Sequence, residues 1–148
     1  MQDEQYLLAV EYYEKFIHLR TEGELNVYAD QDIKIAFVLL QLGHAEAAQP
    51  FLDKFKQFAE SNTSIYRELL WASYYSVLGE TDKGIAHLQE LPKQSGYQYW
   101  LIMAMKDDPL LSNLAVDPAF DIIVNQLKDR FWKEHEALKK TLQGEGLI

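Results

Sequence analysis

Ala36-Phe-Val-Leu-Leu-Gln-Leu-Gly43 and, 36 residues later, Ala72-Ser-Tyr-Tyr-Ser-Val-Leu-Gly79 are two versions of one pattern. In each stretch a small residue comes first, large residues follow at helical spacing, and a leucine precedes a glycine. Apolar residues three and four apart share one face of an α-helix, and a glycine just past the last of them commonly ends the helix. The two stretches therefore predict two helices, each followed by a glycine turn.

The segments that follow the two glycines repeat as well. They are Ala48-Gln-Pro-Phe-Leu-Asp-Lys-Phe55 and Gly84-Ile-Ala-His-Leu-Gln-Glu-Leu91, and a third version, Ala9-Val-Glu-Tyr-Tyr-Glu-Lys-Phe16, lies near the N-terminus. Each begins with a small residue, has a ring three residues later, and continues with apolar residues. Small residues let two helices approach closely. The intervals of 39 and 36 residues are typical of repeated helical hairpins.

These residues resemble the tetratricopeptide repeat family, whose unit of about 34 residues is a helical hairpin with small residues at two fixed positions and a glycine at the turn. The repeats are degenerate, because Gly84 replaces the usual alanine and Phe55 and Leu91 stand where small residues are expected. The resemblance implies an all-α fold of antiparallel helical hairpins stacked as a right-handed superhelix, with repeats at 29–62 and 65–96. A generic helical bundle is the alternative.

Further helices flank the two repeats, and we expect one domain over residues 1–148. A helix at 4–20 resembles the second half of a hairpin, and C-terminal helices cover 97–143, the last of them a long capping helix. Its predicted apolar stripe is Phe120, Ile123, Leu127, Phe131 and Leu138. Ala115-Val-Asp-Pro-Ala-Phe120 resembles the tail that closes tetratricopeptide regions in bacterial regulatory proteins. With the half-repeat at the start, this favours the C-terminal segment of a larger protein.

Polar residues before several of these helices predict where each begins. The predicted N-caps are Asp3, Asp30, Thr81 and Ser95, the last with Gln98 in capping-box spacing. Asp108-Pro109 and Asp117-Pro118 repeat one signature, in which the aspartate caps free N–H groups and the proline takes the first helical position.

Composition narrows the classes of partner and compartment. The chain has 148 residues, with 14 Lys and Arg against 23 Asp and Glu, and a net charge of -9 that disfavours nucleic acid. It has no cysteine, which rules out disulfides and fits the reducing cytoplasm. Its longest strictly apolar run, residues 35–40, is too short to enter a membrane directly.

No recognisable catalytic motif is present. His18, His44, His87 and His135 do not have metal-ligand spacing, and neither a phosphate-binding glycine loop nor a Gly-x-Ser-x-Gly elbow occurs. We therefore expect no enzyme activity, catalytic residue, metal or cofactor. A helical enzyme, or enzyme subunit, with a site built from scattered residues remains the alternative.

The expected function is protein or peptide recognition, because stacked hairpins form an extended concave surface. If the family pattern holds, the first helix of each hairpin faces that side. The predicted partner-binding groove is then Ile33, Phe37, Gln41, Tyr66, Leu69, Ser73, Tyr97 and Leu101. Each of these residues also has a reading as plain packing. A third hypothesis is that the aromatic surfaces pair two copies of the chain as a homodimer.

Overall fold

The computed structural model is all-helical and describes residues 2–25 and 27–148, with the backbone alone for residues 2–4. Over these ranges no strand occurs. The chain divides into two compact units, Met1–Asn62 and Thr63–Ile148, and the division falls between the two predicted repeats. Each unit is described by itself.

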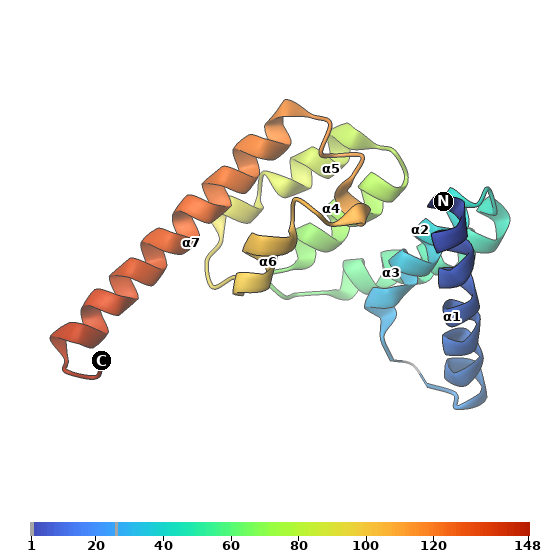
Figure 1. The fold of residues 1–148 in the computed structure, drawn as a ribbon, viewed down its shortest axis with the longest axis horizontal. Coiled ribbons are helices and arrows are strands. Elements are labelled where there is room, and N and C mark those ends of the chain that lie inside the picture. The colour runs from blue at the N-terminus through green and yellow to red at the C-terminus, as the bar shows by residue number, and fades with distance from the viewer. Residues whose placement is uncertain (1, 26) are drawn as a thin grey trace. The chain divides into compact units, whose positions relative to one another are not determined.

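The first unit contains three helices with one short turn of 3-10 helix. They are α1 (Gln2–Glu22), η1 (Ala29–Gln31), α2 (Asp32–Gln41) and α3 (Ala45–Ser61). α2 and α3 form an antiparallel hairpin, and α1 packs against α2 (Figure 1). The side chains of Ile35, Ala36, Leu52 and Phe55 are buried in this unit. Pro50 lies inside α3 without ending it.

The second unit holds the other repeat and the C-terminal helices. Its elements are α4 (Arg67–Val77), α5 (Thr81–Leu88), η2 (Leu91–Lys93), α6 (Tyr99–Ala104), η3 (Pro109–Leu111) and α7 (Pro118–Gly144). α4 and α5 form a hairpin, and α7 packs against α5, α6 and η2. Ala72, Leu88, Leu101, Leu114 and Val124 belong to the one apolar core that these elements share.

The turns of the two hairpins have the same backbone geometry. In each, the amide after the glycine donates to the carbonyl five residues back, and the glycine amide donates to the carbonyl three residues back. Gly43 and Gly79 have φ of 78° and 73°, which glycine adopts without a Cβ penalty. This pattern is the Schellman helix end. The residues that follow also match, with φ and ψ of -92° and 56° at His44 and of -87° and 66° at Glu80. Both predicted glycine turns are confirmed.

The two Asp-Pro signals are confirmed as helix starts. Asp108 accepts a hydrogen bond from the amide of Leu110 at 2.9 Å, and Asp117 accepts one from the amide of Ala119 at 2.8 Å. In both cases the proline is in the first helical turn. The aspartates thus satisfy amides that the first turn leaves free.

Four predicted caps are wrong. α1 begins before Asp3, and Thr81 is already inside α5. Asp30 lies within η1, because the left-handed backbone of Tyr28 starts a helical turn at Ala29.

Ser95 lies four residues before α6, which begins at Tyr99. The chain before α6 is not helical because the buried Tyr97 donates a hydrogen bond from its hydroxyl to the carbonyl of Leu91 at 3.0 Å.

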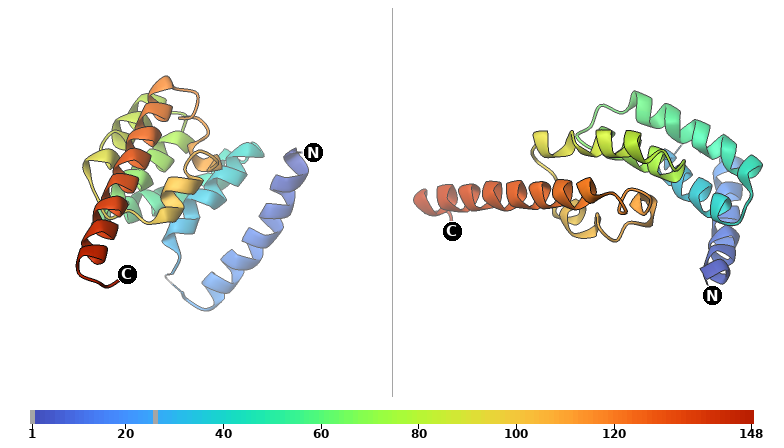
Figure 2. Two further views of the ribbon diagram at one scale, coloured as in Figure 1. Left: turned by 60° about the vertical axis from the view of Figure 1, so that its left-hand side comes forward. Right: turned by 90° about the horizontal axis from the view of Figure 1, so that it is seen from above.

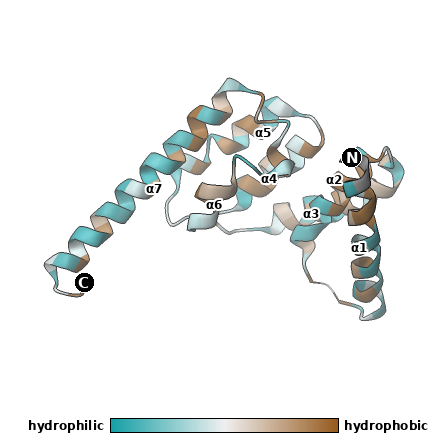
Figure 3. Cartoon of the chain, viewed as in Figure 1, coloured by the Kyte–Doolittle hydropathy of each residue, from teal (hydrophilic) through white to brown (hydrophobic). Residues whose placement is uncertain are grey.

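The long helix α7 covers the core of its unit only with its first half. Phe120, Ile123 and Leu127 are buried, and Phe131 is partly buried. Leu138 is 56% exposed, so the predicted stripe continues past the part that packs. The last turns of α7 extend away from the other helices of the unit (Figures 1 and 2), and they are mostly hydrophilic (Figure 3).

Candidate binding surface

The structure buries most of the predicted groove residues. Ile33, Phe37, Ser73, Tyr97 and Leu101 are buried, Tyr66 and Leu69 are partly buried, and Gln41 is exposed. A buried side chain contributes packing rather than contact with a partner. Gln41, Tyr66 and Leu69 are therefore the members of the set that offer accessible surface, and the groove itself stays a prediction.

Tyr66 joins two aromatic residues that come more than thirty positions later. Its ring lies 5.9 Å from that of Tyr97 and stacks on Trp100 at 5.5 Å, with 30° between the planes. Its hydroxyl accepts a hydrogen bond from the amide of Gln98 at 3.2 Å. The structure thus brings together two predicted site residues, Tyr66 and Tyr97, and adds Trp100 beside them.

The buried Tyr97 side chain connects this ring cluster to the residues before α6. Its hydroxyl donates to the carbonyl of Leu91. Burial, with a smaller contribution from Tyr66, raises the pKa of Tyr97 to about 12. The phenol is therefore neutral at physiological pH. Its hydrogen bond to Leu91 fixes the segment that leads into α6.

A second ring cluster joins α6 to α7. The ring centroid of Tyr99 lies 6.0 Å from that of Phe131 and 6.0 Å from that of Trp132. The ring centroid of Phe131 lies 5.2 Å from those of Trp132 and His135. We call Tyr66, Tyr99, Trp100, Phe131 and Trp132 together the aromatic platform. Tyr99, Trp100 and Trp132 are 52%, 50% and 48% exposed.

The aromatic platform has the composition of a recognition surface. Its rings combine large apolar area with polar groups, and such side chains dominate the energetics of protein interfaces. The indole Nε1 of Trp100 donates to Oε1 of Gln98 at 2.7 Å, which orients the ring. Exposed Met103 lies on the same short helix, α6. These features suit a partner with apolar or aromatic side chains.

Sequence reasoning missed the α7 part of this platform. The sequence pattern places Phe131 only on the packing stripe and does not indicate Trp132, because contacts with Tyr99 across more than 30 residues leave no local signal. The available signal was the pair of aromatic doublets, Tyr99-Trp100 and Phe131-Trp132.

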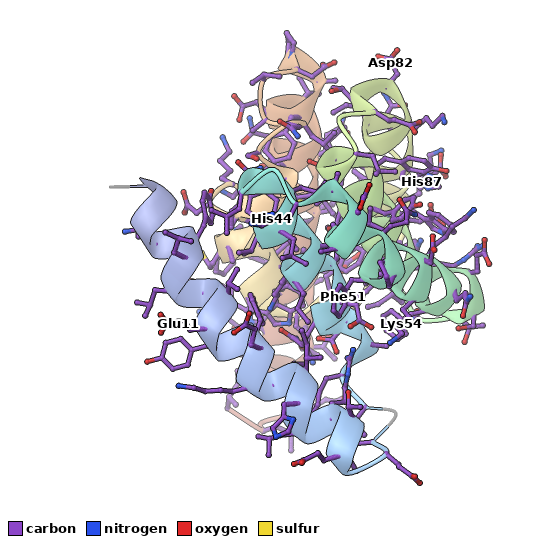
Figure 4. All side chains as sticks on the ribbon, turned by 90° about the vertical axis from the view of Figure 1, so that its right-hand side faces the viewer. Glu11, His44, Phe51, Lys54, Asp82 and His87 are labelled. Atoms are coloured by element: carbon purple, nitrogen blue, oxygen red, sulfur yellow. The ribbon has the colours of Figure 1, made fainter. Side chains whose placement is uncertain are left out.

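His87 is the half-buried ring in the second copy of the repeated segment. Its Nδ1 lies 2.7 Å from Oε2 of Glu68, and its ring stacks on Trp71 and Tyr75. Figure 4 marks it on α5, and marks Phe51, at the matching repeat position, on α3. The contacts of His87 tie α5 to α4. Within the described part of the chain, no group of three or more His, Cys, Asp or Glu side chains is placed to hold a metal ion.

A hollow in the first unit has a volume of about 650 Å³. Arg20 and Asp32 are its most buried charged groups, and they form an ion pair with 2.6 Å between Nη2 and Oδ1. Because this pair joins the end of α1 to the start of α2, we assign it a structural role. A buried carboxylate paired in this way needs its cation, since removal of one partner leaves an uncompensated charge.

No family model, curated protein or solved structure matches this chain. Among the described residues, no helix is both long and apolar enough to cross a bilayer.

Proposed function

We propose that the chain is a non-catalytic module that binds a protein or peptide, and that the aromatic platform is a main part of its binding surface. The observation that carries the proposal is that Tyr99, Trp100 and Trp132 stay about half exposed although each is held by neighbouring rings. Large exposed apolar side chains that gather on a protein surface commonly mark an interaction site. Its rings are already ordered, so binding costs little side-chain entropy.

We also propose that the two hairpins are degenerate tetratricopeptide repeats, stacked as a right-handed superhelix. Their matched glycine turns support this, as do the small buried residues at equivalent positions, Ala36 with Ala72 and Ala48 with Gly84. In such a stack the first helices face the concave side, which would add Gln41 and Leu69 to the binding surface. Small-angle X-ray scattering tests this arrangement. A scattering curve that is fitted only by a chain with unstacked hairpins would contradict it.

The binding proposal is tested by a display selection. The full chain is immobilised, and a library of random peptides of about 12 residues is selected for binding. We expect enriched peptides that contain aromatic or aliphatic residues. Their affinity for Trp100→Ala and for Trp132→Ala should fall by about tenfold or more, because truncation of a central aromatic residue in an interface commonly costs over 1 kcal/mol.

The matched control is Val116→Ala, which removes exposed apolar area from the same unit outside the platform. It should leave the affinity unchanged. Equal binding by the platform variants and the unmodified chain would disprove the assignment of this surface. The homodimer is tested separately. A molar mass that rises with concentration in light scattering would favour pairing of two copies of the chain.

A further inference from the structure

A second aromatic site lies in the first unit, separate from the platform. A hollow of about 400 Å³ is lined by Tyr12, Tyr13 and Phe16 of α1 and by Tyr28 and Gln31. Phe16 and Tyr28 pack with their centroids 6.2 Å apart. Tyr12 and Tyr28 are 64% and 63% exposed, so their rings are largely available to another molecule. We call this hollow the tyrosine groove.

The backbone at Tyr28 has a strained conformation. The residue has φ of 57° and ψ of 41°, the left-handed region that bulky side chains rarely adopt. Its carbonyl accepts a hydrogen bond from the amide of Gln31 at 2.9 Å, which starts η1. An asparagine or glycine would make this turn with less strain. Burial does not explain the tyrosine, because its ring is exposed, and strained residues of this kind cluster at ligand sites.

Charge favours a cationic occupant. The first 62 residues contain eleven acids and five bases, a net charge of -6, and Glu11 beside Tyr12 points away from α1 into solvent (Figure 4). The residues described as lining the groove are uncharged. The faces of aromatic rings carry negative partial charge and attract ammonium and guanidinium groups. The faces of the rings, and at longer range the net charge of the first unit, therefore attract a positive charge.

The chain's own cations show that these rings accept such groups. Nζ of Lys15 lies 5.3 Å from the centroid of Tyr12, and Cζ of Arg20 lies 5.3 Å from the centroid of Phe16. Both distances are within the range of cation–π interactions. Lys15 is exposed and on a flexible side chain, so an incoming cation can replace it at the Tyr12 face.

From the four rings, the strained Tyr28 and the net negative charge of the first unit, we propose that the tyrosine groove binds a lysine- or arginine-bearing segment of a partner protein. Tyr12 and Tyr28 contact the cationic group, Tyr13 and Phe16 receive the aliphatic part of its side chain, and the acidic unit speeds its approach. The site goes beyond the aromatic platform, and either site can fail its test without the other.

The test uses a fluorescently labelled peptide of alternating arginine and glycine, titrated with the full chain at about 0.15 M salt to screen long-range attraction. Tyr12→Ala and Tyr28→Asn each remove a ring without a change of net charge, and asparagine tolerates the left-handed backbone. We expect each to weaken binding by about tenfold. A peptide with norleucine in place of arginine should bind at least tenfold more weakly.

The control is Val116→Ala, which removes exposed apolar area from the second unit outside both proposed surfaces and should leave the affinity for the arginine peptide unchanged. Circular dichroism of each variant should match the unmodified chain, which separates lost binding from lost folding. Equal affinity of all variants would overturn the proposal and indicate diffuse attraction to an acidic protein. Absence of binding would overturn it too, and tight binding of the norleucine peptide would show that the groove is an apolar docking site.

Discussion

Gly84 occupies a repeat position that is alanine in the first hairpin, Ala48, and a single neighbour explains the difference. A Cβ built on Gly84 would lie 2.6 Å from Cδ2 of Leu114, which is fully buried in the core of the second unit. The connection before α7 therefore takes the space that an alanine methyl would fill. Packing against Leu114 therefore explains why glycine replaces alanine at position 84, which the sequence alone does not explain.

Gly84→Ala should destabilise the second unit by about 1–2 kcal/mol, because overpacking a buried site exceeds the helix propensity that alanine gains. Trp71, Trp100 and Trp132, the three tryptophans of the chain, all lie in this unit, so urea unfolding followed by tryptophan fluorescence reports on it. The control is Gly144→Ala in α7, where an added Cβ meets nothing within 4 Å. A Gly84→Ala chain as stable as the control would show that Leu114 moves freely.

Tyr97 makes the stability of the same unit depend on alkaline pH. Its folded-state pKa, raised to about 12, lies above the value of about 10 for an unfolded tyrosine. The stabilising effect of the neutral buried phenol is complete below pH 10 and is lost as pH rises toward 12. Over this window we expect the free energy of unfolding to fall by about 1.4 kcal/mol per pH unit.

Tyr97→Phe isolates this contribution. At pH 7 the variant should be less stable than the unmodified chain by about 1 kcal/mol, because the carbonyl of Leu91 loses the Tyr97 hydroxyl and keeps only the amide of Gln94 as a donor. The gap should close or reverse near pH 11, since phenylalanine does not titrate. A gap that stays constant from pH 8 to pH 11.5 in urea unfolding would contradict the assigned pKa.

Among the elements, the two hairpin turns offer the sharpest test of internal repetition. Gly43 and Gly79 have positive φ, and nothing lies within 4 Å of a Cβ added to either. Gly43→Ala and Gly79→Ala should therefore each cost about 1 kcal/mol through backbone strain alone. Thermal unfolding by circular dichroism measures the first, and tryptophan fluorescence measures the second. A loss in only one variant would show that the turns are not equivalent.

The same turns show what local sequence predicts well. Glycine after an apolar helix face and Asp-Pro before one are signals complete within a few residues, and the structure confirms both kinds at Gly43, Gly79, Asp108 and Asp117. Ser95 is not a helix cap, because a tertiary contact keeps the chain after it out of a helix. The burial of Tyr97 and its bond to Leu91 hold the preceding chain out of a helix.

At the scale of the whole molecule, helix class and hairpin pairing follow from periodicity, but the candidate surface does not. Helix phase places Ile33 and Leu101 on an apolar face without telling whether that face meets a partner or the core, and both are buried. The aromatic platform depends on the contact of Tyr99 with Trp132, which follows from how α6 and α7 pack. Such contacts are set by tertiary structure. The sequence shows only that aromatic residues occur in both segments.

The proposed binding of a partner at the aromatic platform is tested most directly by the indole N–H signals in a nitrogen–proton correlation NMR spectrum. The chain should give three such signals, which Trp→Phe variants assign to Trp71, Trp100 and Trp132. Addition of a selected peptide should shift the signals of Trp100 and Trp132, which are about half exposed, and leave that of buried Trp71 in place. Unchanged signals from both Trp100 and Trp132 at saturation would contradict the account.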